Sequence, residues 1–153
     1  MATALVVDDS KVEQLTAGGL LQRTCGMSVV FADHGREALE QMGRQLPDLV
    51  LTDLQMPEMD GLELVEAIRE RHPTVPVILM TAHGSEELAA EALRRGAAGY
   101  VPKRQLAREL QATVAAVLAA ATAHGERLEL LACLQESALQ FVLDNDITLI
   151  QPL

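Results

Sequence analysis

Residues 49–61 read LVLTDLQMPEMDG, and the fold can be predicted outward from this stretch. Residues 49–51 form an apolar run typical of a strand that is buried on both faces, as in a parallel sheet. The run ends at a carboxylate, Asp53, and the turn signals Met-Pro and Asp-Gly follow it. Because an aspartate at the end of a buried strand is poorly solvated, we expect a neighbouring cation to compensate its charge.

Strand-like and helix-like patterns alternate along the chain. Four other apolar runs lie at residues 4–8, 27–32, 75–81 and 99–101. Helical patterns lie at residues 10–23, 35–44, 61–71 and 85–96 and from Arg104 onward. Five such alternations predict an α/β fold with right-handed βαβ units and a doubly wound, five-stranded parallel sheet covered on both faces. We expect this domain to span residues 1–122.

The composition fits one domain of this kind and disfavours other classes of protein. Hydrophobic residues make up 49% of the 153 residues and charged residues 22%, an ordinary globular balance. The 22 acidic residues outnumber the 12 Lys and Arg, and the net charge of −10 argues against nucleic-acid binding. Cys25 and Cys133 match no metal or redox spacing, and the sequence shows neither a secretory signal nor a membrane span. We expect a cytoplasmic protein that contacts no membrane.

Polar side chains follow the predicted strands at the points where the strands end. These residues are Asp8 and Asp9, Asp33, Asp53, Thr81 and Lys103. Because the carboxyl ends of parallel strands lie at one edge of a sheet, we expect the side chains to converge there. Taken singly, the acidic pair could cap the next helix and Asp53 could open a loop, but their joint occurrence favours a site.

The expected convergence predicts a particular chemistry. Crowded carboxylates repel unless a cation is present, and hard oxygen ligands favour Mg²⁺. Lys103 and the Thr81 hydroxyl are suited to holding phosphate oxygens. A carboxylate beside a metal ion and a lysine has the parts for in-line phosphoryl transfer onto Asp53.

Four motifs make residues 3–122 resemble the receiver domain of two-component response regulators. They are VVDDS at 6–10, LVLTDLQMPEMDG at 49–61, VPVILMTAHG at 75–84 and GAAGYVPKR at 96–104. The resemblance implies the flavodoxin-like strand order 2-1-3-4-5. It also implies that Asp53 is the phosphoacceptor, supplied by a sensor histidine kinase or a histidine phosphotransfer protein.

The resemblance further implies a role for individual residues around Asp53. Asp9 is implied as a direct Mg²⁺ ligand and Asp8 as a ligand through water, together with Asp53 and the backbone carbonyl of Gln55. Thr81 and Lys103 are implied to grip the phosphoryl oxygens, aided by the backbone N–H of Ala82.

Two further roles concern switching and the lifetime of the phosphoryl group. Tyr100 is implied as the aromatic switch residue, which turns inward as Thr81 moves and remodels the surface of the fourth helix, fifth strand and fifth helix. The side chains of Gln55 and His83 are implied to tune hydrolysis of the aspartyl phosphate.

The sequence departs from the family after Lys103. Most members have a proline there, joined through a cis peptide bond, whereas this chain has Arg104. A cis Lys103–Arg104 bond would cost about 3–4 kcal/mol, against about 0.5–1 kcal/mol before proline. We therefore expect a trans bond.

Residues 123–153 extend beyond the predicted receiver domain. They are expected to form a linker or a continuation of the fifth helix past Gly125. Two copies of the chain could pair through this extended helix or through the surface of the fourth helix, fifth strand and fifth helix. The stretch FVLDNDITLIQPL at 141–153 predicts a strand, an acidic cap and a helix start. It is weakly similar to the beginning of the histidine-kinase-like ATPase domains of anti-sigma-factor kinases, which favours a piece of a longer protein with a truncated output domain.

Two other functions compete with a regulatory phosphoacceptor that is not an enzyme. A Mg²⁺-dependent phosphohydrolase with an aspartate nucleophile usually has a second aspartate two residues later, where this chain has Gln55. A receiver-like docking module that works without phosphorylation would have lost site residues, whereas this chain keeps them.

Overall fold

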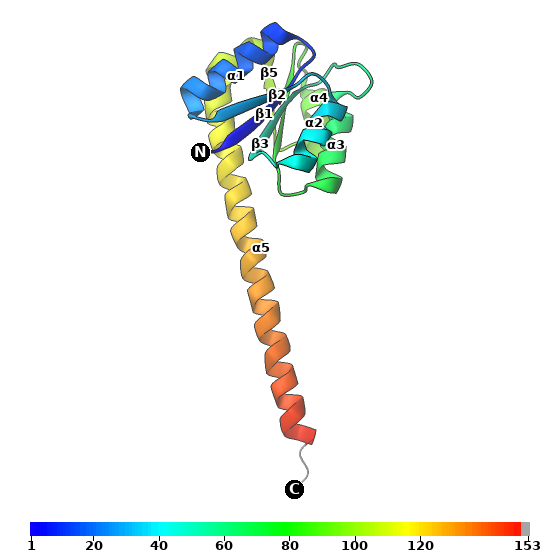
Figure 1. Ribbon diagram of the computed structural model, residues 1–153, viewed down its shortest axis with the longest axis vertical. Coiled ribbons are helices and arrows are strands. Elements are labelled where there is room, and N and C mark those ends of the chain that lie inside the picture. Colours follow the sequence, from blue (N-terminus) through cyan, green and yellow to red (C-terminus); the bar gives the residue numbers. More distant parts are fainter. Residues whose placement is uncertain (151–153) are drawn as a thin grey trace. The chain divides into compact units, whose positions relative to one another are not determined.

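The computed structural model describes the backbone of residues 1–150 and the side chains of residues 1–139. The strands are β1 (Thr3–Val7), β2 (Ser28–Ala32), β3 (Leu49–Asp53), β4 (Val77–Thr81) and β5 (Gly99–Pro102). The helices labelled in Figure 1 are α1 (Lys11–Cys25), α2 (Gly35–Arg44), α3 (Gly61–Arg71), α4 (Glu86–Arg95) and α5 (Leu106–Ile150). A 3-10 turn (Lys103–Gln105) precedes α5. The chain divides into two compact units, Met1–Ala121 and Thr122–Leu153.

The first unit contains a five-stranded sheet in the order β2-β1-β3-β4-β5. All four strand pairs are parallel, and the register places Asp53 opposite Met80 and Thr81 opposite Pro102. The predicted doubly wound α/β fold and its strand order are therefore confirmed. This register aligns the carboxyl ends of β3, β4 and β5 at one edge of the sheet.

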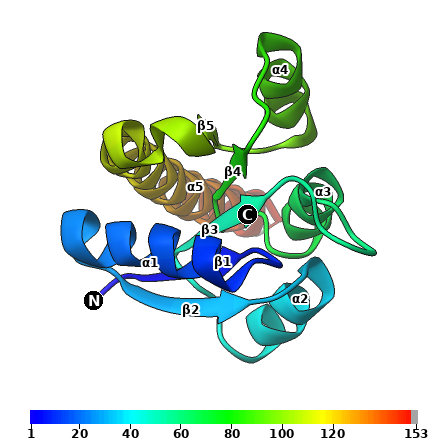
Figure 2. The same cartoon turned by 90° about the horizontal axis from the view of Figure 1, so that it is seen from above.

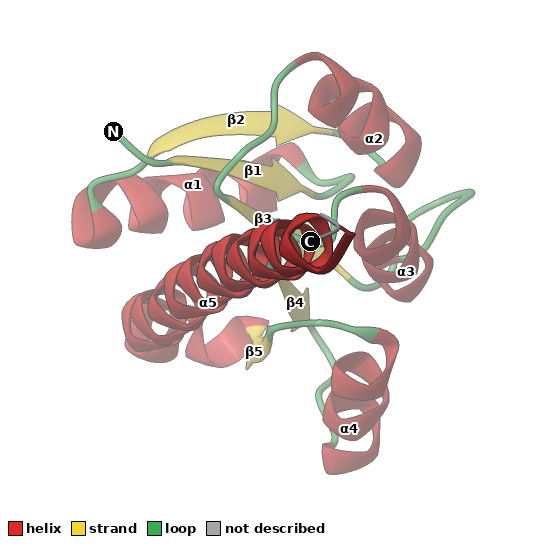
Figure 3. Cartoon of the chain, turned by 90° about the horizontal axis from the view of Figure 1, so that it is seen from below, coloured by secondary structure: helices red, strands yellow, loops and turns green. Residues whose placement is uncertain are grey.

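Two apolar layers cover the faces of this sheet. Side chains of α1 and of the first turns of α5 pack on one face, and side chains of α2, α3 and α4 pack on the other. Figure 2 shows this division from above. In Figure 3, α2 and α3 lie on the opposite side of the strands from α1. The core is aliphatic, as the low aromatic content of the sequence requires.

Local signals explain where the elements begin and end. The Ser10 hydroxyl accepts from the Glu13 N–H at the start of α1, and Gly26, with φ 64°, ends this helix two residues later than predicted. Strand β4 begins at Val77 rather than at residue 75, because Pro76 has no N–H for the ladder. The 3-10 turn delays the start of α5 to Leu106.

The prediction for residues 141–150 is wrong in one respect: they continue α5 instead of forming a strand. The preceding residues are rich in Leu, Ala, Glu and Gln, and extending an existing helix costs far less than nucleating a new element. Of the two alternatives expected after residue 122, a linker or a continuation of the fifth helix past Gly125, the structure has the continuation. Residues 151–153 lie outside the described part of the chain. None of the described helices is long and apolar enough to cross a membrane.

Candidate phosphoacceptor site

Asp53 lies at the carboxyl end of the central strand and is 6% exposed. Its Oδ1 accepts a hydrogen bond from the Leu54 N–H at 2.9 Å and lies 3.1 Å from the Lys103 ammonium. Burial raises the pKa of the Asp53 carboxyl, and Lys103 partly opposes this effect. The Oδ2 atom accepts no hydrogen bond from the described residues, so one oxygen of the carboxylate is held and the other is free.

The position of Asp53 is secured by the close approach of the start of α3 to the end of β3. The Gly61 N–H donates to the Leu54 carbonyl at 2.7 Å where α3 begins. A Cβ on Gly61 would lie 2.3 Å from the Asp53 carbonyl oxygen and 2.7 Å from a methyl group of Leu79. Only glycine therefore lets α3 begin directly against the end of β3.

Lys103 lies among three carboxylates. Its ammonium is 3.0 Å from Asp8 Oδ2, contacts Asp53 and forms a short ion pair with Glu13. Burial lowers the pKa of Lys103, but the hydrogen bonds that its ammonium donates to the carboxylates outweigh burial and raise that pKa overall. The lysine reaches the site although the Lys103–Arg104 bond is trans, as expected.

Asp8 is the most deeply buried member of this group, with a fully buried side chain. Burial raises its pKa from the ordinary value of 3.8 to about 6, against the opposing effects of the Ser10 N–H and Lys103. Oδ1 of Asp8 accepts from that N–H at 2.9 Å, while Oδ2 faces Lys103. Asp8 thus combines two functions that the sequence had offered as alternatives, because it contributes to the start of α1 and also to the site.

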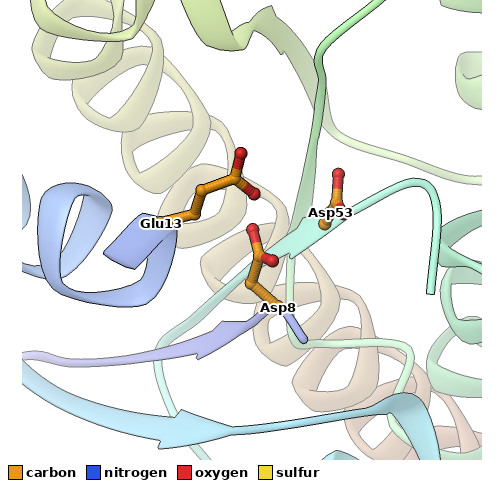
Figure 4. A group of neighbouring side chains, drawn as sticks. All are labelled: Asp8, Glu13 and Asp53. Carbon is orange, nitrogen blue, oxygen red and sulfur yellow. The ribbon is translucent and has the colours of Figure 1, made fainter. Parts of the chain in front are cut away.

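Figure 4 shows the carboxylates of Asp8, Glu13 and Asp53 converging on one space. One ligand oxygen from each lies within 4.8 Å of the others. Glu13 is not among the site residues predicted from the sequence. The signal available for it was its position at the start of α1, one turn after the acidic pair.

The remaining predicted metal ligands lie beside this group. Asp9 is exposed and lines an open groove together with Gln55 and Asp60. Asp33 does not join the site, contrary to the predicted convergence of all strand-end carboxylates. It pairs with Lys11 at 2.6 Å and accepts from buried Gln14 at 2.8 Å, so two side chains of α1 compete for this carboxylate.

The β4–α4 loop carries the predicted phosphate-contacting and switch residues. The buried Thr81 hydroxyl accepts from the His83 N–H at 3.3 Å, and Ala82 and His83 are exposed. Tyr100 is half-buried, and its buried hydroxyl has no hydrogen-bond partner among the described residues. A Cβ on Gly84 would lie 2.5 Å from that hydroxyl, so the glycine leaves room for the ring.

Comparison with known proteins identifies the family. Residues 4–115 match the model of the response regulator receiver domain. This chain is a member of that family. The matched region contains Asp8, Asp53, Thr81 and Lys103, which are the groups gathered at the carboxyl edge of the sheet.

Individual relatives agree with this assignment. The transcriptional regulatory protein ZraR of Escherichia coli K12 is 44% identical over 115 residues, which are 75% of this chain and 26% of that protein. The regulatory protein LuxO of Vibrio cholerae is 43% identical over 110 residues, 72% of this chain and 24% of that protein. The receiver domain thus spans about a quarter of the length of these relatives, both of which are regulators.

A solved structure shows the same fold. The response regulator receiver domain protein of Clostridium thermocellum superposes with a TM-score of 0.71 at 28% identity. The alignment covers 86% of this chain and 99% of that protein. The fold and the function class predicted from the sequence are therefore confirmed.

Proposed function

We propose that this receiver domain accepts a phosphoryl group on Asp53 from the phosphohistidine of a sensor histidine kinase or a histidine phosphotransfer protein. The observation that carries the proposal is the arrangement of the two Asp53 oxygens. Oδ1 is held by the Leu54 N–H and Lys103, which leaves Oδ2 available for attack. In the transfer, an electron pair of Oδ2 forms the new O–P bond, the N–P bond of phosphohistidine breaks, and the imidazole nitrogen keeps its electron pair.

Lys103 supplies the positive charge that this site holds permanently. Its side chain is 15% exposed, so water screens its interaction with a phosphoryl oxygen only weakly. The Thr81 hydroxyl and the Ala82 N–H lie on the loop that follows β4 and would donate to the same group. These donors would stabilise the charge on the transferring phosphoryl group.

The site also suits a divalent cation. Its candidate ligands are carboxylate oxygens, which Mg²⁺ prefers. The negative charges of the three carboxylates, Asp8, Glu13 and Asp53, together exceed the single positive charge of Lys103. We propose that Asp9, Asp53 and the Gln55 carbonyl hold Mg²⁺ directly, with Asp8 acting through water. A bound Mg²⁺ would neutralise oxygens of the transferring group.

We propose that phosphorylation changes the surface formed by α4, β5 and α5. In the unphosphorylated domain, the Thr81 hydroxyl is bonded within its own loop and the Tyr100 hydroxyl has no described partner. Movement of Thr81 toward the phosphoryl group would open space for the Tyr100 ring. Thr81 and Tyr100 would then favour the second of two conformations of the α4, β5 and α5 surface. The side chains of Gln55 and His83, which flank the site, would tune the lifetime of this state.

We also propose that two copies of the chain pair through the continuation of α5. Apolar side chains at Leu128, Leu131 and Leu134 are 46%, 49% and 57% exposed. Leu128 and Leu131 continue the spacing of three and four residues that begins at Leu110, Val114 and Val117. Most helical stability in proteins comes from packing of an apolar face, and pairing would bury the apolar stripe of this helix.

The proposed activity is regulatory. Phosphoryl transfer would control an output domain or a partner protein in the cytoplasm, and Asp53 would promote only its own phosphorylation and dephosphorylation. Gln55 stands where a phosphohydrolase of this chemistry would place its general acid, so we expect no sustained turnover of a phosphate ester.

Incubation with Mg²⁺ and acetyl phosphate, followed by intact-mass measurement, tests the central proposal. The protein should gain one phosphoryl group and Asp53→Asn should gain none. Asp33→Asn is the matched control, because it removes a strand-end carboxylate that lies outside the site. Labelling of Asp53→Asn at the parent rate would contradict the assignment. A parent protein that stays unlabelled, also with a phosphorylated histidine phosphotransfer protein, would favour the docking module.

A further inference from the structure

Glu13 does not make the contact that its position in the helix predicts. It lies three residues after Ser10, the N-cap of α1, where a glutamate usually reaches back to the N-cap N–H. That N–H is already taken by Oδ1 of Asp8 at 2.9 Å. The Glu13 carboxylate is therefore free to turn toward the site, where it accepts from Lys103.

The contact has a consequence for Lys103. An ammonium group has three N–H donors, and here it faces three carboxylates, those of Asp8, Glu13 and Asp53. An incoming phosphoryl oxygen can bind Lys103 only if one of these contacts is given up.

Burial decides which contact can be released. The side chains of Asp8 and Asp53 are 0% and 8% exposed, so losing a partner would leave a buried charge without compensation. The Glu13 side chain is 44% exposed and has flexible bonds that allow its carboxylate to move into water. Glu13 is therefore the partner that Lys103 can lose at least cost.

We propose that Glu13 is a positioning residue that competes with the phosphoryl group for the Lys103 ammonium. It occupies the place of a phosphoryl oxygen on Lys103 and leaves when Asp53 is phosphorylated. Glu13 thereby holds the lysine over the unphosphorylated site and slows phosphorylation. This inference rests on the proposed phosphoacceptor function, since it assigns a determinant of rate to the same site.

The primary test compares Glu13→Gln with Glu63→Gln in the complete chain. Glu63 occupies the equivalent position at the start of α3, is exposed, and has no described ion pair. At saturating Mg²⁺, Glu13→Gln should raise the rate of labelling by acetyl phosphate about three- to fivefold, as expected for loss of one partly exposed competing ion pair. Affinity for beryllofluoride should rise by a similar factor. Glu63→Gln should stay within about twofold of the parent on the same scale.

A second comparison shows whether Glu13 acts through Lys103. In a Lys103→Gln background, the gain from Glu13→Gln should disappear, whereas a general effect of negative charge would persist. In Mg²⁺-free protein, the ¹⁵N signal of the Lys103 ammonium should shift in Glu13→Gln and not in Glu63→Gln. This signal reports the contact even if Lys103→Gln is labelled too slowly to compare.

The outcomes separate this inference from the proposed function. A labelled parent with equal rates in both variants, or a slower Glu13→Gln, would overturn the role of Glu13 and leave the phosphoacceptor function intact. An unchanged ammonium signal in Glu13→Gln would also overturn it. A parent that no phosphodonor labels would overturn the proposed function itself.

Discussion

Gly61 approaches Asp53 so closely that a Cβ on the glycine would lie 2.3 Å from the carbonyl oxygen of the aspartate. We predict that Gly61→Ala lowers the free energy of unfolding by about 1–3 kcal/mol, the usual cost of overpacking, and also slows phosphorylation, because the backbone at Asp53 has to shift. Urea denaturation and acetyl phosphate labelling measure the two effects.

Gly43 provides the control for this substitution. It lies inside α2, and a Cβ there would meet no atom within 4 Å. Gly43→Ala should therefore stabilise the domain by about 0.5–1 kcal/mol. Equal effects of the two alanines would show that the close approach at Asp53 is not a constraint.

The raised pKa of Asp8 predicts how the stability of the metal-free domain depends on pH. The folded protein binds the Asp8 proton with a pKa of about 6, above the ordinary 3.8, so the protonated form favours folding. This contribution is fully present below pH 3.8 and is lost as the pH rises through 6. A shift of this size corresponds to about 3 kcal/mol.

Asp8→Asn isolates this effect. In EDTA, the parent should lose more stability than the variant between pH 4 and pH 6.5, as measured by urea denaturation at each pH. Asp33→Asn should keep the parental slope in this interval, because Lys11 lowers the pKa of that carboxyl. Parallel curves for the parent and Asp8→Asn would contradict the assignment of the raised pKa to Asp8.

Mg²⁺ should raise the melting temperature of the domain. At a concentration 100-fold above its dissociation constant, a ligand that binds only the folded state adds about 2.7 kcal/mol of stability. Asp9→Asn and Asp53→Asn should remove most of this gain if the proposed ligand set is correct. Glu13→Gln should keep most of it. Loss of the gain in Glu13→Gln and Asp53→Asn, with the gain kept in Asp9→Asn, would place the ion among Asp8, Glu13 and Asp53.

The proposed pairing through α5 predicts an association that depends on the exposed leucines. Joint substitution of Leu128→Glu and Leu131→Glu should convert the dimer to a monomer in analytical ultracentrifugation. Leu93→Glu alters an exposed leucine on α4. This helix belongs to the alternative dimer surface, which is formed by α4, β5 and α5. Dissociation by Leu93→Glu alone would assign the dimer to α4, and a parent that is monomeric at all concentrations would exclude both surfaces.

Prediction from the sequence was accurate where the signal was local and repeated. The limits of α2 and α3 match their predicted ranges, because apolar periodicity runs through each helix and a side chain, His34 or Asp60, caps its first turn. Prediction failed at residues 141–150, where the residues suggested a strand. These residues are helical because they extend α5, and adding residues to an existing helix requires no new nucleation.

Local patterns along the chain were enough to predict the alternating elements, the parallel sheet and the position of Asp53 at the carboxyl end of a buried strand. These features follow from periodicities that each segment carries within it. Which charged groups contact one another depends on the folded arrangement. Lys11 and Gln14 hold Asp33 away from the site, and the occupied Ser10 N–H leaves Glu13 free to reach Lys103. Such choices depend on competition between partners that are distant in the sequence, and the competition exists only once the chain has folded.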